Sequence, residues 1–423
     1  MKKLICVLCA ILSLATTMQA QKTARSITVK TEAGKDEVIG LPEGLLSETD
    51  SLYLDWISRN YIDWGENCTA TAVNPVVSDS VYIERLQRIP ALIEMPFNSV
   101  VREFIEMYAT RLRQKVAFML SANNLYMPII EEAFDLYDLP LELKYLPVIE
   151  SAMNPKATSP QGAVGLWQFM LGTAKIYGLK NTSLVDERRD PVKSTRAAAR
   201  YLRDLYDIYH DWNLVLAAYN CGPGVINKAI RRAGGEKDFW ALYDYLPSTT
   251  RGYVPAFIAA NYIMTYYCEH NISPLDMRLP ESTDTLHISR PLSLQQVAAV
   301  CGANIDQLRA LNPEFKKDII PGNEETYALR LPTPLVSTFL DREDSIYNYK
   351  PETYIGRRTT VAVKSDSRAA DKSSTGKAVY HKIRNGETLG SIAARYGVSV
   401  VQLQRLNGIK GTAIRAGKSI RIR

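Results

Sequence analysis

Glu150 is the residue of this chain whose type and position best suit acid–base chemistry. It takes the next place on an apolar stripe that Leu139, Leu143 and Leu146 form at spacings of four and three residues. We expect a helix that begins near Pro140 and carries a carboxyl group where a leucine would be expected. Burial disfavours the charged form and raises the pKa of such a carboxyl group, as a proton donor near neutral pH requires. The alternative is a capping or ion-paired glutamate, and the motifs further along the chain favour the first interpretation.

The first of these motifs is the segment GAVGLWQFM at residues 162–170. Gly162 and Gly165 allow the backbone to approach a ligand closely, and Gln168 is a lone amide in an apolar run that needs a hydrogen-bond partner. Sugar hydroxyl groups are such partners. A turn around a buried Trp167 would explain the same segment without any ligand.

The second motif is AAYNCGPG at residues 217–224, which predicts a helix that ends at a Gly-Pro-Gly break. Tyr219 and Asn220 then lie exposed in the last turn of this helix. The end of a helix explains the glycines, but it does not explain the Tyr-Asn pair.

Four motifs in order carry a resemblance to a known family: Glu150-Ser151, GxxGLWQFM, AAYNCGPG and the segment YLPSTTRGY at residues 245–253. They resemble the catalytic domain of lytic transglycosylases with a goose-lysozyme-like fold. The likeness covers roughly residues 86–269, and the sequence DERRD at 186–190 makes it most similar to the membrane-bound lytic murein transglycosylase D branch. The resemblance implies a mainly α, lysozyme-like catalytic domain.

The resemblance also implies a reaction. Glu150 would protonate the glycosidic oxygen between N-acetylmuramic acid and N-acetylglucosamine in peptidoglycan. It would then take a proton from the C6 hydroxyl group of the muramic acid, which attacks C1 and closes a 1,6-anhydro ring without consuming water. One motif carboxylate fits this route, because ordinary glycosidases need two.

Further site residues follow from the same resemblance, and no cofactor or metal ion is implied. Sugar hydroxyl and acetamido groups would be held by Ser151, Gln168 and Asn220; the cleft would be lined by Met170 and Tyr219; and Tyr253 would hydrogen-bond near Glu150. The acids at Asp186–Asp190 could supply a second carboxylate, but their alternation with arginines favours a structural ion-pair network.

The positioning elements are organised in several parts. We expect an irregular lead-in at residues 21–85, the helical catalytic domain at 86–275, and two small α+β modules at 286–332 and 379–423. The second module has the order βααβ and the first is a looser repeat of it. The polar stretch at 341–378 between them cannot bury a core and predicts a flexible tether.

Both small modules resemble LysM modules, the tail closely and the earlier one weakly. The resemblance implies that the tail binds N-acetylglucosamine-containing glycan through Gly386, Glu387, Thr388, Leu389, Leu406, Asn407 and Gly408. From Val379 to Arg423, nine Lys/Arg face one acid, so a charge of +8 adds attraction to the carboxylates of wall peptides. A tethered binding module raises the local concentration of the enzyme on an insoluble polymer. A role of the tail in binding another protein stays open.

The start of the chain resembles a secretory signal at residues 1–20, with Lys2 and Lys3 before an apolar run. We therefore expect an exported monomer in the periplasm, associated with the cell wall and lacking a transmembrane segment. Attachment to the outer membrane is doubtful, because neither Cys6 nor Cys9 lies in a convincing lipidation sequence. The remaining cysteines allow three full pairings, among which the sequence does not choose: Cys68, Cys221, Cys268 and Cys301.

Composition excludes disorder throughout, since 46% of the 423 residues are hydrophobic, and scattered histidines without CxxC spacing argue against a zinc site. Three alternatives to a lytic transglycosylase remain. A lysozyme-type muramidase would release reducing ends, and a wall-binding scaffold would not cleave at all. Nucleic-acid binding by the basic tail would give a strongly salt-dependent affinity for DNA.

Overall fold

A computed structural model describes residues 25–31, 34–46, 73–275, 280, 282–356, 380–383, 389–396, 398, 400–409, 411 and 414–422. The expected signal segment, Cys68 and three residues of the tail, Gly386, Glu387 and Thr388, lie outside this part of the chain.

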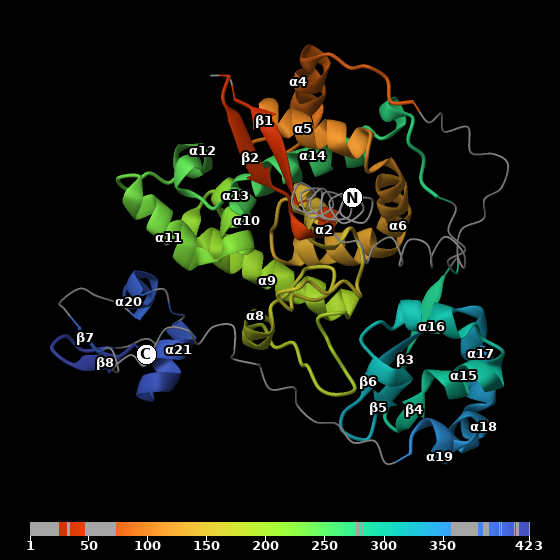
Figure 1. The fold of residues 1–423 in the computed structure, drawn as a ribbon. Coiled ribbons are helices and arrows are strands. Elements are labelled where there is room, and N and C mark those ends of the chain that lie inside the picture. Colours follow the sequence, from red (N-terminus) through yellow and green to blue (C-terminus); the bar gives the residue numbers. More distant parts are fainter. Residues whose placement is uncertain are drawn as a thin grey trace, which may run out of the picture.

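The largest part of the structure is a helical domain, as the sequence predicts (Figure 1). Its centre is α14 (Tyr253–Thr265), in which every residue from Tyr253 to Met264 is buried. A helix that is apolar on all sides has to be surrounded, and α5, α7 and α10 are among its neighbours. The other helices of the domain are α4 (Asp79–Arg88), α5 (Ser99–Ala109), α6 (Arg113–Leu136), η1 (Leu141–Tyr145), α7 (Leu146–Ser151), α8 (Leu171–Ile176), α9 (Pro191–Tyr209), α10 (Trp212–Cys221), α11 (Pro223–Arg232), α12 (Phe239–Leu242), η2 (Tyr243–Tyr245), α13 (Ser248–Arg251) and η3 (Cys268–His270).

The helix that carries Glu150 is shorter than the sequence suggests. A continuous helix from about Pro140 was expected, but the structure has the 3₁₀ turn η1 followed by the short helix α7. Pro147 lacks a backbone N–H and clashes with a preceding turn, so a helix has to begin anew there. The leucine stripe is nevertheless buried, and Leu143 and Leu146 have no exposed surface.

The Gly-Pro-Gly break lies where it was predicted. Gly222 has a φ of +83° and ends α10, and Pro223 is the first residue of α11. A left-handed φ is easy for glycine, and the fixed φ of proline suits the first turn of the next helix.

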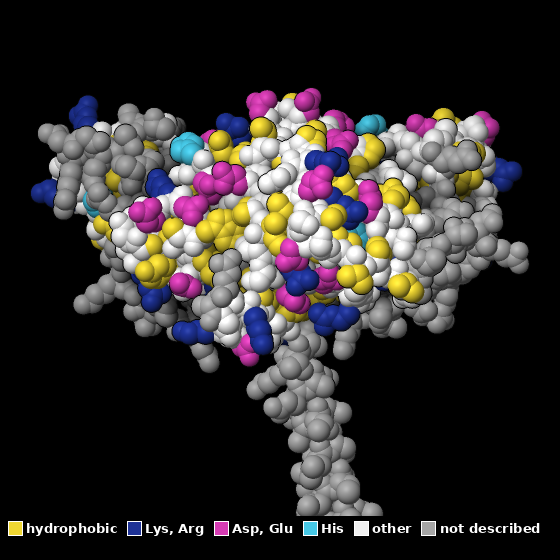
Figure 2. Space-filling view, turned by 90° about the horizontal axis from the view of Figure 1, so that it is seen from above, with side chains coloured by type: hydrophobic (Ala, Val, Ile, Leu, Met, Phe, Trp, Pro, Cys, Tyr) yellow, Lys and Arg dark blue, Asp and Glu magenta, His cyan; other side chains and the backbone are white. Residues whose placement is uncertain are grey.

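The N-terminal part contains regular structure where an irregular lead-in was expected. Strands β1 (Ser26–Lys30) and β2 (Asp36–Gly40) form an antiparallel hairpin, and the short helix α2 (Glu43–Leu46) follows. The buried side chains of this segment belong to the core of the helical domain: Ile27, Val29, Ile39, Leu41 and Leu45. The hairpin lies next to α13 and α5 (Figure 1). On the face seen from the hairpin side, acidic and basic side chains are scattered among apolar and uncharged ones (Figure 2).

The first small module is built on two antiparallel strand pairs. Strand β3 (Thr283–Ile288) pairs with β6 (Tyr327–Pro332), and β4 (Pro291–Ser293) pairs with β5 (Ile319–Pro321). Its helices are α15 (Leu294–Cys301), α16 (Ile305–Leu311), η4 (Lys316–Asp318), α17 (Pro334–Asp341), α18 (Glu343–Asn348) and α19 (Pro351–Tyr354).

The tether was expected to begin at residue 341, and this boundary is wrong, because α18 and α19 lie within residues 343–354. Ile346 and Tyr347 supply the reason, since both side chains are buried in the core of the module.

The tail has the predicted order βααβ: β7 (Tyr380–Lys382), α20 (Leu389–Tyr396), α21 (Val400–Asn407) and β8 (Ser419–Arg421). The two modules share a hydrogen-bond pattern that supports their relation as repeats. The Asn312 side chain donates to the carbonyl oxygen of Arg330 at 2.9 Å and accepts from its backbone N–H at 2.8 Å. The Asn407 side chain is bonded to Arg421 in the same way, at 2.8 and 2.7 Å.

In the described part of the chain, no helix has both the length and the apolar character needed to cross a membrane. The three described cysteines, Cys221, Cys268 and Cys301, are free thiols.

Candidate active site

Glu150 lies in the last turn of α7 and is half-buried as a residue, directly after the fully buried Val148 and Ile149. Its Oε1 atom accepts a hydrogen bond from the Tyr253 hydroxyl group. Burial raises the pKa of Glu150 to about 7; the bond from Tyr253 opposes this rise, and the negative charge of Glu43 adds to it. The carboxyl group thus has the properties predicted for a proton donor near neutral pH.

Tyr253 is the first residue of α14 and is almost completely buried. Burial, together with the neighbouring charge of Glu150, raises the pKa of its hydroxyl group well above 10. The hydroxyl group therefore keeps its proton near neutral pH and donates a hydrogen bond to Glu150.

The glycine-rich loop folds back on itself, with Val164 paired to Phe169. Gly165 has a φ of +92°, and a Cβ atom added to it would lie 1.9 Å from the carbonyl oxygen of Arg188. The close approach that was predicted for a ligand is therefore made to the protein's own backbone. Trp167 is fully buried, and its Nε1 donates to the Thr195 hydroxyl group at 2.9 Å.

Two predicted sugar-binding side chains also hold this loop in place. Gln168 donates through Nε2 to the carbonyl oxygen of Gly165 at 2.8 Å. Ser151 is buried and donates to the carbonyl oxygen of Leu166 at 2.9 Å, which ties the end of α7 to the loop. Contacts of both side chains with sugar stay a prediction, and the side-chain oxygen of Gln168 is the group suited to accept from a sugar hydroxyl group. Met170 is 47% exposed at the end of the loop.

The end of α10 is connected to both of these elements. The Tyr219 hydroxyl group donates to the carbonyl oxygen of Trp167 at 2.8 Å, and its ring lies 5.2 Å from that of Tyr201. Asn220 is exposed, and its Oδ1 accepts from the Thr250 hydroxyl group at 2.9 Å. The structure thus brings the motifs around Glu150, Trp167, Tyr219 and Tyr253 together, although they are up to 103 residues apart in sequence.

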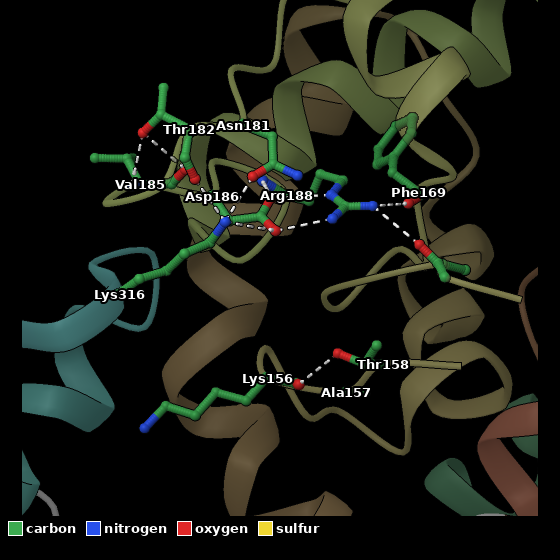
Figure 3. Close-up of polar contacts among 12 residues, drawn as sticks. Lys156, Ala157, Thr158, Phe169, Asn181, Thr182, Val185, Asp186, Arg188 and Lys316 are labelled. Carbon is green, nitrogen blue, oxygen red and sulfur yellow. Dashed lines mark hydrogen bonds and ion pairs between the residues drawn. The ribbon is translucent and has the colours of Figure 1, made fainter. Parts of the chain in front are cut away.

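The acidic cluster at Asp186–Asp190 is the predicted ion-pair network. Asp186 and Arg188 are buried and joined by two bonds of 2.9 and 2.8 Å. Arg188 also donates to the carbonyl oxygens of Gly162 and Phe169, at 3.0 and 3.2 Å, and so supports both ends of the glycine-rich loop (Figure 3). Asp190 accepts from the first backbone N–H groups of α9. These carboxylates are bonded within the protein and do not form a second acid for catalysis.

The same segment docks the first small module onto the helical domain, which the sequence did not reveal. Leu184 and Val185 are buried in the core of the module. The backbone of Asp186 donates to Glu314 at 2.9 Å, and the backbone of Lys316 donates to Leu184 at 2.7 Å. The Lys316 side chain reaches across toward Asp186 and Asn181 (Figure 3).

Arg330 completes this contact between the two domains. Its guanidinium group pairs with Asp190 at 2.9 Å and with Glu314 at 3.0 Å, and all three side chains are largely buried.

In the tail, the described candidates for glycan binding differ in what they can offer. Leu389 is buried in the core of the module, so only its backbone can reach a ligand. Asn407 is engaged with Arg421, whereas Leu406 is 39% exposed. Gly408 has a φ of +62° directly after α21.

Comparisons with known proteins agree with this arrangement. A family model described as "Transglycosylase SLT domain" matches residues 127–241. The model "Lytic transglycosylase MltD, LysM-like domain" matches residues 282–348, and "LysM domain" matches residues 381–423.

Among curated proteins, the chain is 32% identical over 337 residues to the membrane-bound lytic murein transglycosylase D of Escherichia coli (strain K12). That alignment covers 78% of this chain and 70% of the relative. The soluble lytic murein transglycosylase of the same strain is 35% identical over 124 residues, which is 28% of this chain and 19% of the relative. The crystal structure of the 70 kDa soluble lytic transglycosylase of Escherichia coli matches 35% of this chain and 26% of its own, with 28% identity and a TM-score of 0.30.

Proposed function

This chain belongs to the family of membrane-bound lytic murein transglycosylases D and is a peptidoglycan lytic transglycosylase, and on that premise we propose that Glu150 is its one catalytic acid and base. The observation that carries the proposal is the half-buried Glu150, whose carboxyl group is bonded to Tyr253 and has a pKa raised to about 7. At this pKa both protonation states are accessible near neutral pH, as a group that first donates and then accepts a proton requires.

In the first step, protonated Glu150 donates its proton to the glycosidic oxygen between N-acetylmuramic acid and N-acetylglucosamine. The bond between this oxygen and C1 of the muramic acid breaks, and positive charge develops at C1. The resulting carboxylate of Glu150 is stabilised by the hydroxyl proton of Tyr253.

In the second step, the Glu150 carboxylate takes the proton of the C6 hydroxyl group of the same muramic acid. The C6 oxygen attacks C1 and closes the 1,6-anhydro ring. Glu150 is then protonated again, so the cycle needs neither water nor a second carboxylate.

The remaining site residues are proposed to orient the glycan beside Glu150. Gln168 and Asn220 would bind hydroxyl and acetamido groups, and Met170 and Tyr219 would pack against the sugar rings. The proposal is supported by the hydrogen bonds of Gln168 and Tyr219, which hold the glycine-rich loop and the end of α10 in place. Ser151 is proposed to act through the loop, since its hydroxyl group is bonded to Leu166.

We also propose that the chain is exported through residues 1–20, acts as a monomer in the periplasm, and binds glycan through its tail. The tail has its own small core, built from residues 383–422, and its loss leaves the other cores complete. Removal of residues 379–423 should lower sedimentation with purified sacculi and leave cleavage of soluble glycan strands unchanged. Equal sedimentation of the shortened chain would assign the tail another role.

The decisive experiment compares the wild type with Glu150→Gln on purified sacculi, with mass analysis of the released muropeptides. We expect 1,6-anhydro muramic ends from the wild type and a loss of activity of at least about 1,000-fold in the variant. The control is Glu103→Gln, which changes an exposed glutamate on α5. Reducing muramic ends would indicate a hydrolase, and full activity of Glu150→Gln would move the acid elsewhere.

A further inference from the structure

The segment from β2 to α2, residues 36–46, lies against the backbone of Glu150 and against Gly252, the residue before Tyr253, and we call it the N-terminal clasp. It precedes the match to the transglycosylase domain, which begins at residue 127. Its sequence carries none of the motifs that identify the site. Its contacts with the helical domain nevertheless converge on Glu150 and Tyr253.

One end of the clasp rests on the helix that carries Glu150. A Cβ atom added to Gly44 would lie 2.5 Å from the carbonyl oxygen of Ile149 and 2.7 Å from the carbonyl carbon of Glu150. The backbone of α2 therefore lies directly on the backbone of the last turn of α7. A side chain at position 44 would have to push the two helices apart, because backbone atoms cannot rotate away.

The other end of the clasp rests on the turn before Tyr253. A Cβ atom added to Gly252 would lie 2.6 Å from the carbonyl oxygen of Gly40. Gly40 itself is crowded by Thr249, whose Cα would be 3.0 Å from an added Cβ. The end of β2 thus fixes the first turn of α14, where Tyr253 begins.

Side chains fasten the clasp at further points. Arg251 pairs with Glu37 in a partly buried contact between α13 and β2. The ammonium group of Lys115, on α6, donates to the carbonyl oxygen of Gly44 at 3.3 Å. Ile39 and Leu45 are buried in the core of the helical domain, so the clasp belongs to the rigid part of the structure.

We propose that the N-terminal clasp is a positioning element of the active site, which holds the Glu150 carboxyl group against the Tyr253 hydroxyl group. This inference rests on the proposed role of Glu150. Glu43 is exposed, and it adjoins Gly44 at the contact with α7. It is a positioning residue that acts through Glu150, not a second catalytic acid.

The charge of Glu43 gives the clasp an electrostatic effect as well as a mechanical one. The groups that face Glu150 are Tyr253 from α14, Tyr219 from α10 and Glu43 from α2, with Lys115 from α6 behind Gly44. Of these, Glu43 adds a like charge, which favours the protonated form of Glu150.

The test is Gly44→Ala, measured as kcat and KM on soluble, uncross-linked peptidoglycan strands. The added Cβ needs about 3.4 Å from the Ile149 carbonyl oxygen instead of 2.5 Å, so the two backbones must separate by about 0.9 Å. Because a misplacement of about 1 Å can cost about 100-fold in rate, we expect kcat to fall 10- to 100-fold with KM little changed.

A matched control separates a shifted site from general crowding. Gly322, in the first small module, would place a Cβ 2.4 Å from the carbonyl oxygen of Arg290, which is as crowded as Gly44. Gly322→Ala should lose similar stability but keep the wild-type kcat once the folded fraction is equal. A folded Gly44→Ala protein with wild-type kcat would overturn the proposal.

Glu43→Gln keeps the test decisive if Gly44→Ala does not fold, because residue 43 is exposed. We expect the alkaline limb of its pH–rate profile to move to lower pH, a change that a purely structural role would not produce. An unmoved limb would contradict the proposal, and complete loss of activity would make Glu43 a catalytic acid instead. Glu150→Gln, assayed in parallel, tests the proposed function by itself. If Glu150→Gln is inactive while Gly44→Ala and Glu43→Gln are unaffected, the proposed role of the clasp is wrong and that of Glu150 stands.

Discussion

A carboxyl group that is kept protonated for catalysis should cost the folded protein stability at alkaline pH. The perturbation that reveals this cost is Glu150→Gln, because the amide keeps the size of the side chain and its oxygen still accepts from Tyr253. Burial raises the pKa of Glu150 in the folded state from 4.5 to about 7. The folded state therefore holds this proton more tightly than the unfolded state does.

The sign and the size follow from these two pKa values. The stabilisation from the bound proton is fully present below about pH 4.5 and is lost as the pH rises through about 7. At about 1.4 kcal/mol for each pH unit, this interval corresponds to about 3 kcal/mol. Glu150 is only half-buried as a residue, which weakens the effect of burial, and we therefore expect about 2 kcal/mol.

The assay is denaturant unfolding at pH 4.5 and pH 8, followed by tryptophan fluorescence, since Trp167, Trp212 and Trp240 all lie in the helical domain. The free energy of unfolding of Glu150→Gln should exceed that of the wild type by about 2 kcal/mol more at pH 8 than at pH 4.5, or about 4–8 °C in Tm. For the control Glu103→Gln, the difference from the wild type should not depend on pH. A difference for Glu150→Gln that stays constant or shrinks with rising pH would refute the reasoning, because burial would then not dominate the pKa of Glu150.

Two other substitutions test neighbouring parts of the structure. Tyr253→Phe removes the hydrogen-bond donor that favours the carboxylate form of Glu150. We expect kcat to fall about 10- to 100-fold and the alkaline limb of the pH–rate profile to move to higher pH. An unmoved limb would contradict this role of Tyr253. Arg330→Met leaves Asp190 and Glu314 without their buried cation. We expect the free energy of unfolding, measured by denaturant titration at pH 7, to fall by about 3–5 kcal/mol. A loss below about 1 kcal/mol would show that the contact between the domains does not depend on this network.

The parts that sequence predicts well are those encoded locally. The stripe of Leu143 and Leu146 before Glu150 is a helical period within a dozen residues, and the structure buries it as expected. The break at Gly222 and Pro223 is also a local signal, because both residues have a restricted set of backbone conformations.

The partners of the glycine-rich loop could not be predicted, because they depend on contacts distant in sequence. Gly165 lies against the carbonyl oxygen of Arg188, and no periodicity indicates that pairing. The sequence therefore predicted ligand contacts for the whole loop, whereas part of the loop packs against the protein's own backbone. Which of its groups face sugar is decided by the hydrogen bonds that the protein leaves unused.

The N-terminal hairpin, by contrast, has a local pattern in the sequence. Ile27 and Val29 alternate with polar residues, Ile39 follows after a turn at Gly34, and this pattern is typical of a short hairpin. What no pattern shows is where such a hairpin docks. That information resides in the shape of the surface formed by α13 and α5.

The burial of Leu184 and Val185 in the module that follows has a practical consequence for dissecting this enzyme. A chain shortened to end at residue 275 would keep every catalytic motif but would present these two aliphatic side chains to water on an otherwise polar loop. Exposed apolar surface of this kind promotes self-association. The smallest fragment that remains well behaved in solution should therefore extend to residue 356, well beyond Tyr253, the last motif residue of the helical domain.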